Sequence, residues 1–147
     1  MDAKLLDRLE AQCSRREYCV SDIRAKALKA TGGDAVVADE IVASLVSGGY
    51  VDNGRYAAAF ARDKSSLSGW GPVKIRLSLS AKGISSDDIR AALEGVDPGR
   101  SDARLDRLIA AKRKSLEGDP QQKLKLLRYL LGRGYEYDAV VKAIERN

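Results

Sequence analysis

The fold is decided by the stretch Gly48-Gly49-Tyr50-Val51-Asp52-Asn53-Gly54-Arg55-Tyr56-Ala57-Ala58-Ala59-Phe60. The paired glycines end one helix, because glycine adopts the left-handed conformation that closes a helix at no steric cost. Asp52 then provides an N-cap for the next helix. That helix carries Tyr56 and Phe60 on one face, since residues four apart lie on the same side of a helix. The stretch therefore predicts two successive helices joined by a short turn.

Apolar residues at helical spacing, broken by glycine or proline, recur along the whole chain. The expected helices lie near residues 2–14, 20–31, 35–47 and 52–66, then from Pro72 to Gly83, from Ser85 to Gly95, from Ser101 past Leu116, from Pro120 to Gly132, and over Val140 to the end. The fold class is therefore all-α.

Local signals fix several of these helix ends. Ser85 followed by Asp88 is a capping box, in which the first side chain accepts from the amide of the second residue. Asp119-Pro120 is a cap followed by proline at the first helical position, where the missing amide proton costs nothing. The helix after it holds Leu124, Leu127 and Leu131 at helical spacing.

The helices fall into three groups of three, with turn glycines at Gly33, Gly83 and Gly134. A period of about 50 residues indicates a repeat architecture, and the first unit has a loop about two residues longer than the others. We expect three tandem three-helix repeats in an elongated, curved arrangement, over residues 1–49, 50–98 and 99–147. A single compact helical bundle is the alternative.

Composition excludes several kinds of chemistry. The 147 residues contain no His, so Ser-His-Asp, Cys-His and Cys/His zinc sites cannot form. No catalytic, metal-binding or cofactor-binding residue is expected, and an enzyme is the least favoured class. Cys13 and Cys19 are expected to be free thiols in a reducing cytosol. The charged start and the lack of a long apolar run predict neither a signal peptide nor a membrane segment.

The net charge of +5 is unevenly distributed. Residues 1–50 carry 7 basic and 8 acidic groups, residues 51–99 carry 7 and 6, and residues 100–147 carry 12 and 7. The excess therefore lies in the last third, which predicts attraction to nucleic acid or to an acidic protein surface. A solvated helix surface of mixed charge is the alternative explanation.

The middle of the chain resembles the RecX family of bacterial RecA regulators. The resemblance rests on Gly49-Tyr50-Val51-Asp52, Arg55-Tyr56-Ala57, Phe60, Gly71-Pro72, Ile75, Lys82-Gly83-Ile84 and, upstream, Arg16-Glu17-Tyr18 with Asp22-Ile23. It covers about residues 5–95. The chain departs from the family pattern at Cys19, where a capping Ser is usual, and at Lys64, where Arg is common. The segment Asp52-Asn53-Gly54 replaces a more acidic stretch, and Gly54 is expected to weaken the helix start.

The resemblance implies three tandem three-helix repeats and a monomer in the bacterial cytoplasm that does not catalyse a reaction. It implies binding in the groove of the RecA filament, with reduced ATP hydrolysis and strand exchange, in recombination, DNA repair and the SOS response. Some family members also contact DNA, so weak binding to single- or double-stranded DNA is a second expectation. The alternative function is a helical module that acts on DNA directly.

Two sets of residues follow as candidates. The filament- or DNA-binding basic surface comprises Arg62, Lys64, Lys74, Arg76, Arg104, Arg107, Lys112, Arg113, Lys123, Lys125 and Arg128. The family signature, expected to be mostly structural, comprises Tyr50, Asp52, Arg55, Tyr56, Phe60, Trp70, Gly71, Pro72 and Gly83. Two roles stay open for Trp70: a plug in the core or between repeats, or an exposed anchor for a partner.

Overall fold

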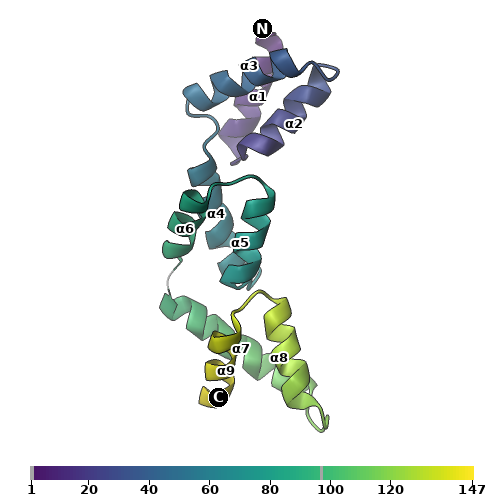
Figure 1. The fold of residues 1–147 in the computed structure, drawn as a ribbon, viewed down its shortest axis with the longest axis vertical. Coiled ribbons are helices and arrows are strands. Elements are labelled where there is room, and N and C mark those ends of the chain that lie inside the picture. Colours follow the sequence, from purple (N-terminus) through teal and green to yellow (C-terminus); the bar gives the residue numbers. More distant parts are fainter. Residues whose placement is uncertain (1, 97) are drawn as a thin grey trace. The chain divides into compact units, whose positions relative to one another are not determined.

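A computed structural model describes residues 2–96 and 98–147 of the chain. Within those residues the chain forms nine α-helices and no strand, which confirms the all-α class (Figure 1). The helices are α1 (Ala3–Arg15), α2 (Val20–Ala30), α3 (Ala35–Ser47), α4 (Asn53–Ser66), α5 (Pro72–Ala81), α6 (Ser86–Glu94), α7 (Pro98–Ser115), α8 (Gln122–Gly132) and α9 (Tyr137–Arg146).

The chain divides into two compact units. Unit 1 comprises residues 1–59 and 79–91, and unit 2 comprises residues 60–78 and 92–147. The division passes through α4 and α5, so each unit takes part of the middle three-helix group. The repeat boundaries expected after residues 49 and 98 stay a prediction.

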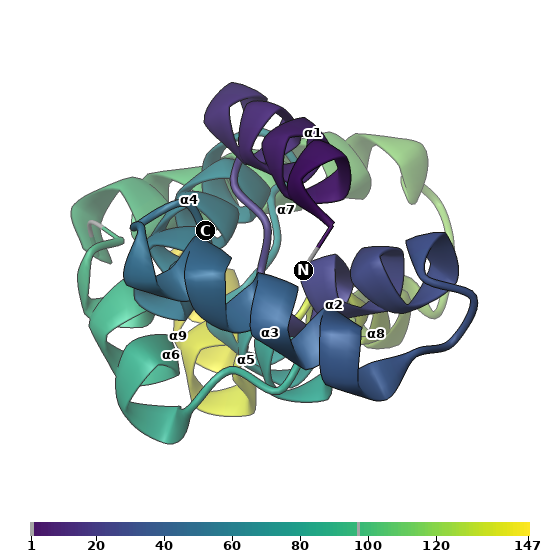
Figure 2. The ribbon, with the colours of Figure 1, turned by 90° about the horizontal axis from the view of Figure 1, so that it is seen from above.

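In unit 1, α2 and α3 pack side by side and α1 contacts α3 (Figures 1 and 2). Their buried residues lie at helical spacing, because only one face of each helix is apolar. Leu5 and Leu9 of α1 meet Ile23 of α2 and Ile41 and Leu45 of α3 in one hydrophobic cluster. Tyr18 and Tyr50, which lie just before α2 and α4 respectively, pack against this cluster.

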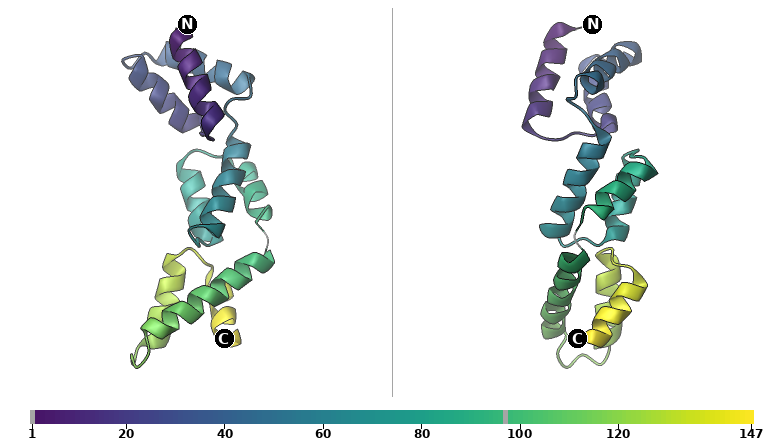
Figure 3. Two further views of the ribbon diagram at one scale, coloured as in Figure 1. Left: turned by 180° about the vertical axis from the view of Figure 1, so that it is seen from behind. Right: turned by 90° about the vertical axis from the view of Figure 1, so that its left-hand side faces the viewer.

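In unit 2, helices α7, α8 and α9 pack pairwise (Figure 3). Ile109 of α7, Leu126 and Leu130 of α8 and Val140 of α9 form their common core. The α8 core residues therefore differ from the Leu124, Leu127 and Leu131 pattern found in the sequence. Leu124 is 42% exposed and Leu131 is 38% exposed, so that second apolar face of α8 lies toward solvent.

The repeat period proves more regular than the sequence suggested. The turns α2–α3, α5–α6 and α8–α9 each span four residues, and their equivalent glycines are Gly32, Gly83 and Gly134, each with positive φ. The expected equivalence of Gly33, and the longer first loop, are therefore wrong. Gly33 also has positive φ, and residue type could not separate the two because both are glycine.

Two predicted helix starts are wrong. Helix α7 begins at Pro98 and not at Ser101, because a proline ring presets the φ of a first helical turn. Residue 97, within the expected break from Gly95 to Gly99, lies outside the described residues. Helix α8 begins at Gln122 and not at Pro120. The Asp119 carboxylate accepts from the Gln121 amide at 2.8 Å, which makes a separate turn before the helix.

Other predicted ends are confirmed. The Asp52 carboxylate accepts from the Arg55 amide at 2.9 Å at the start of α4, and the Ser85 hydroxyl accepts from the Asp88 amide at 3.2 Å before α6. Pro72 is the first residue of α5. No helix in the described part of the chain has the length and apolar character needed to span a membrane.

Candidate functional site

All eleven candidate basic residues belong to unit 2. Four lie on α4 and α5, four on α7 and three on α8; their side chains fall into three classes by contact. The classes are exposed cations without an acidic partner, cations paired with a carboxylate, and cations held against aromatic rings, hydroxyl groups or backbone.

The first class consists of the free cations Arg107, Lys123 and Arg128. All three are exposed, and none forms an ion pair within residues 2–96 and 98–147. Arg62 is close to this class, because its side chain is 71% exposed and its carboxylate neighbour Asp63 lies 3.9 Å away. These side chains can bind an external anion without breaking an internal contact.

The second class is partly neutralised. Arg76 lies 3.5 Å from Glu136, and Lys125 lies 2.6 Å from Asp119. Hydrogen bonds from Lys125 and from the Gln121 backbone lower the pKa of Asp119 below its ordinary value. Surface pairs of this kind contribute at most about 1 kcal/mol, so a competing anion can displace either carboxylate.

The third class includes Lys64 and Lys74, which lie against the ring of Trp70, a residue shortly after the end of α4. The ammonium groups of Lys64 and Lys74 lie 4.7 and 4.3 Å from the centroid of its ring. Phe60 meets the same indole edge-on, with centroids 6.0 Å apart. Trp70 is half-buried, so it packs within unit 2 and still keeps part of its surface in solvent.

Three further candidates on α7 also make internal contacts. Arg104 donates to the hydroxyls of Ser65 (2.8 Å) and Ser101 (3.1 Å), and Arg113 reaches the Ile144 carbonyl at 3.4 Å. Lys112 lies 4.7 Å from the centroid of the Tyr129 ring. These cations support the unit as well as adding to its positive potential.

Arg133 is a cation that the sequence reasoning missed as a site candidate, because it lies in a glycine turn. Its guanidinium donates to the Ser68 carbonyl at 2.7 Å and lies 5.9 Å from the Tyr129 ring centroid. Its Nε, like that of Arg104, is buried with no hydrogen-bond partner among the described residues. Both guanidinium groups lower the pKa of Tyr135, but burial outweighs them and raises it.

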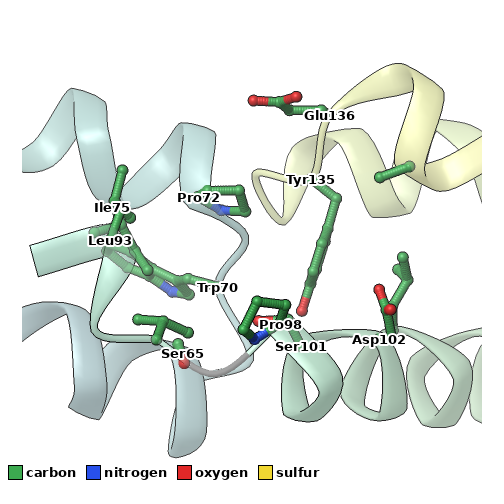
Figure 4. A pocket seen from close by; sticks show the side chains of 13 residues that line it. Ser65, Trp70, Pro72, Ile75, Leu93, Pro98, Ser101, Asp102, Tyr135 and Glu136 are labelled. Atoms are coloured by element: carbon green, nitrogen blue, oxygen red, sulfur yellow. The ribbon is translucent and has the colours of Figure 1, made fainter. Parts of the chain in front are cut away.

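A cavity of about 290 Å³ lies beside Trp70. Trp70 and Tyr135 face it from opposite sides, with Pro72 and Pro98 between them (Figure 4). Ser65 and Ser101 also line it, next to the guanidinium that binds both hydroxyls. The cavity wall is therefore mostly apolar, and its charged residues are the carboxylates Asp102 and Glu136.

Successive three-helix groups contact each other at two places. Each set of contacts is called a joint, and one joint lies inside each unit. In unit 1, the Ser21 hydroxyl donates to the Lys82 carbonyl at 2.8 Å, and Lys82 binds both carboxylate oxygens of Asp22 at 2.8 and 3.1 Å. Asn53 accepts from the Val20 amide at 2.8 Å. Cys19 makes no side-chain cap to α2, as expected of a thiol, and Asn53 replaces that cap.

In unit 2 the backbone makes most of the corresponding joint, beside the Arg76–Glu136 ion pair. Gly71 donates its amide to the Arg133 carbonyl at 2.8 Å, and Val73 donates to the Gly134 carbonyl at 2.9 Å. A β-carbon on Gly71 would lie 2.4 Å from Gly134, so only glycine permits this approach. The Tyr135 hydroxyl donates to the Gly69 carbonyl at 3.1 Å and closes the joint.

Sequence comparison relates the chain to known regulators. A model of the second three-helix domain of RecX matches residues 52–93, the region of α4 to α6. The regulatory protein RecX of Chromohalobacter salexigens is 33% identical over 132 residues, which cover 89% of this chain and 84% of that relative. The chain belongs to the RecX family. The regulatory protein RecX of Escherichia fergusonii is 30% identical over 142 residues, covering 90% and 85% of the two chains.

Solved RecX structures share the fold. A crystal structure of a regulatory protein RecX superposes with a TM-score of 0.86 at 24% identity, covering 97% of this chain and 71% of that one. RecX from Lactobacillus salivarius gives a TM-score of 0.82 at 23% identity, covering 98% and 94%. At these identities the likeness shows the fold alone, and it agrees with tandem three-helix repeats.

The RecX signature residues of unit 1 make structural contacts. Arg55 binds the Glu17 carboxylate at 2.6 Å and donates to the carbonyls of Gly49 and Tyr50 at 2.9 and 3.2 Å. Tyr56 is buried. Gly83 has a φ of +78° in the α5–α6 turn. These contacts join the end of the first group to the start of α4, where the family pattern is densest.

Proposed function

We propose that this RecX family member binds the RecA–DNA filament and inhibits RecA ATP hydrolysis and strand exchange, thereby regulating recombination, DNA repair and the SOS response. Membership of a family of regulatory proteins supports a role in binding rather than catalysis. The expected form is a monomer in the bacterial cytoplasm.

The observation that carries the proposal is the set of free cations in unit 2. Arg107, Lys123 and Arg128 are exposed without an acidic partner among the described residues, so they retain their full charge for a partner. Arginine can bind a carboxylate or a phosphate through two parallel hydrogen bonds. Binding that favours one filament state over another would lower RecA turnover by shifting that equilibrium.

The first test is RecA ATP hydrolysis on single-stranded DNA, with and without the protein, at two salt concentrations. We expect inhibition that weakens at the higher salt, because exposed charge interactions are screened. Co-sedimentation with the filaments should follow the same salt dependence. An unchanged rate together with no co-sedimentation would refute the proposal.

Charge reversal should have different effects in the different classes of cation. Charge reversal of Arg107, Lys123 and Arg128 together should abolish filament binding and leave the unfolding temperature unchanged. Reversal at Arg104 and Arg113 should weaken binding and also lower stability, because both make internal hydrogen bonds. Lys29→Glu on the exposed surface of α2 is the matched control. Retained binding by the triple variant would contradict the assignment.

Direct binding to DNA is a second candidate, favoured by the Lys64–Trp70–Lys74 cluster. Aromatic rings next to cations can stack bases while the cations contact phosphate. Trp70 is the single tryptophan of the chain, so its fluorescence reports on this cluster alone. Quenching by an oligonucleotide at physiological salt, with an affinity above that for RecA filaments, would favour this candidate.

A further inference from the structure

Helix α8 carries two apolar faces, and the core of unit 2 covers one of them. Leu126 and Leu130 are buried against α7 and α9. Leu124, Leu127 and Leu131 form a second stripe, the outer stripe, because residues three, four and seven apart share one side of a helix. Leu124 and Leu131 are 42% and 38% exposed, whereas Leu127 is half-buried and also packs against the core cluster.

The outer stripe continues into a hollow between α8 and α9. Two adjoining hollows of about 140 and 300 Å³ share Lys123, Ile144 and Glu145 in their walls. Leu127, Val141 and Tyr137 line the smaller one, and Tyr137 is 59% exposed. Leu127 belongs both to the outer stripe and to the wall of the smaller hollow, so the stripe borders the hollows, and together they are called the α8–α9 groove.

Positive charge borders this groove. At about 100° of rotation per residue, Lys123 and Arg128 lie on opposite sides of the outer stripe, and both are free cations. Arg113 of α7 lines the larger hollow. Glu145 is the one acidic residue among those that line either hollow. The outer stripe and the smaller hollow therefore make a mainly apolar floor, whereas charged and polar side chains line most of the larger hollow. Cations lie on both sides of the stripe.

We infer that the α8–α9 groove binds a short amphipathic helix of a partner protein, with apolar side chains toward the floor and Asp or Glu on its flanks. Leucines at positions i, i+3 and i+7 match the apolar spacing of a facing helix, which would pack into them over two turns. Carboxylates on the flanks of that helix would meet Lys123 and Arg128. This inference names a site and a ligand chemistry that the proposed function leaves open.

The test uses two designed peptides of about 14 residues, both acetylated and amidated, with leucines at helical spacing. One has Glu at every flanking position and the other has Lys. Methyl NMR of the full chain should show saturable shifts at Leu124, Leu127, Val141 and Ile144 with the Glu peptide. The Lys peptide should bind at least about tenfold more weakly, because its flanks repel the groove edges.

Variants make the result specific to the groove. Leu124→Glu and Leu131→Glu should each weaken binding of the Glu peptide about tenfold or more. Both side chains are exposed enough for the variants to fold. Val36→Glu is the control, because Val36 is 70% exposed on α3 in unit 1. Substituting both Lys123 and Arg128 with Glu should reverse the preference, so that the Lys peptide binds more tightly than the Glu peptide. Lys29→Glu should leave the preference for the Glu peptide unchanged.

Four outcomes would overturn the inference. Equal affinity for the two peptides would remove the charge argument, and shifts on another surface would remove the site. Methyl shifts that depend on protein concentration alone would identify a second copy as the occupant. Displacement of the peptide by oligothymidylate, with stronger shifts at the same methyl groups, would identify nucleic acid. Each measurement uses this chain without RecA, so a failed RecA assay would leave the result intact.

Discussion

The two joints between successive three-helix groups consist of different kinds of contact. In unit 1 the start of α2 meets the α5–α6 turn through the side chains of Ser21, Asp22 and Lys82, and it meets the start of α4 through the Asn53 side chain. In unit 2 the start of α5 meets the α8–α9 turn mainly through backbone hydrogen bonds. The helix starts explain part of this difference. The Val20 amide needs a hydrogen-bond acceptor, which Asn53 supplies, whereas Pro72 has no amide proton to donate.

The two joints therefore constrain the same repeat fold in two different ways. A joint made by side chains tolerates backbone change but depends on charge and on pH. A joint made by close backbone approach depends on shape, because close-packed atoms cannot make room for an added carbon. Repeats that share a fold therefore need not share the residues that connect them.

Gly134→Ala should give the largest effect. Its φ is +96°, and a β-carbon there would lie 2.3 Å from the β-carbon of Lys74 and 2.7 Å from its backbone nitrogen. Backbone strain and overlap should together lower the free energy of unfolding by about 3 kcal/mol or more. Urea denaturation measures this loss.

Gly83→Ala is the matched control for that substitution. Gly83 occupies the equivalent turn of unit 1 with a φ of +78°, and a β-carbon there meets nothing within 4 Å. Only the left-handed backbone is then penalised, at about 1 to 2 kcal/mol. If the two alanine variants lose the same stability, the distinction between the joints is wrong.

The glycine and capping patterns explain how much of the fold could be predicted from sequence. Helix ends depend on local chemistry, so Asp52, Ser85 and Pro72 fixed their helix starts correctly. Residue type could not choose between Gly32 and Gly33, whereas strictly equal spacing of the three turn glycines would have chosen Gly32. The apolar period could not choose the buried face of α8, since two apolar stripes run along that helix.

The candidate surface was harder to predict than the fold. Basic residues were found by type, and all of them fall in unit 2. Sequence could not separate a free cation such as Arg107 from one such as Arg104, whose partner Ser65 lies 39 residues away in the chain. Asn53 was noted only as part of a departure from the family pattern. Its partner, the Val20 amide, is a long-range contact that no local motif encodes.

Asn53→Ala should have a smaller effect than Gly134→Ala. Its Oδ1 accepts the Val20 amide where Cys19 makes no cap, so the substitution leaves that amide without a partner. Loss of an N-cap typically lowers the free energy of unfolding by about 1 kcal/mol. Adding Cys19→Ser should recover part of that loss, because a hydroxyl can cap α2 from within the chain. Thermal unfolding of the two single variants and the double variant tests this, and strictly additive losses would show that the two positions do not share a role.

The Lys82–Asp22 pair should give the smallest effect, and one that depends on pH. Burial tends to raise the pKa of Asp22, but hydrogen bonds from Lys82 and Cys19 and the charge of Lys82 outweigh it and hold this pKa below 3.8. The hydrogen bond to Asp22 raises the pKa of Lys82 above 10.5. The pair therefore stabilises unit 1 fully between these values. Its contribution falls as pH drops below 3.8 through the folded pKa of Asp22, and as pH rises through that of Lys82.

Because both side chains are partly exposed, this contribution should be below about 1 kcal/mol. Lys82→Met should move the pKa of Asp22 back toward 3.8, which carboxyl NMR titration measures directly. Amide exchange at the start of α2 should lose its acid dependence in the same variant, while Lys29→Met leaves both unchanged. The donor and acceptor groups of the backbone bonds from Gly71 and Val73 in unit 2 do not titrate, so the protection of these amides should not follow the loss of the Lys82–Asp22 pair as pH falls below 3.8. A step at those amides that Lys82→Met removes would mean that the two joints are energetically coupled, despite their different construction.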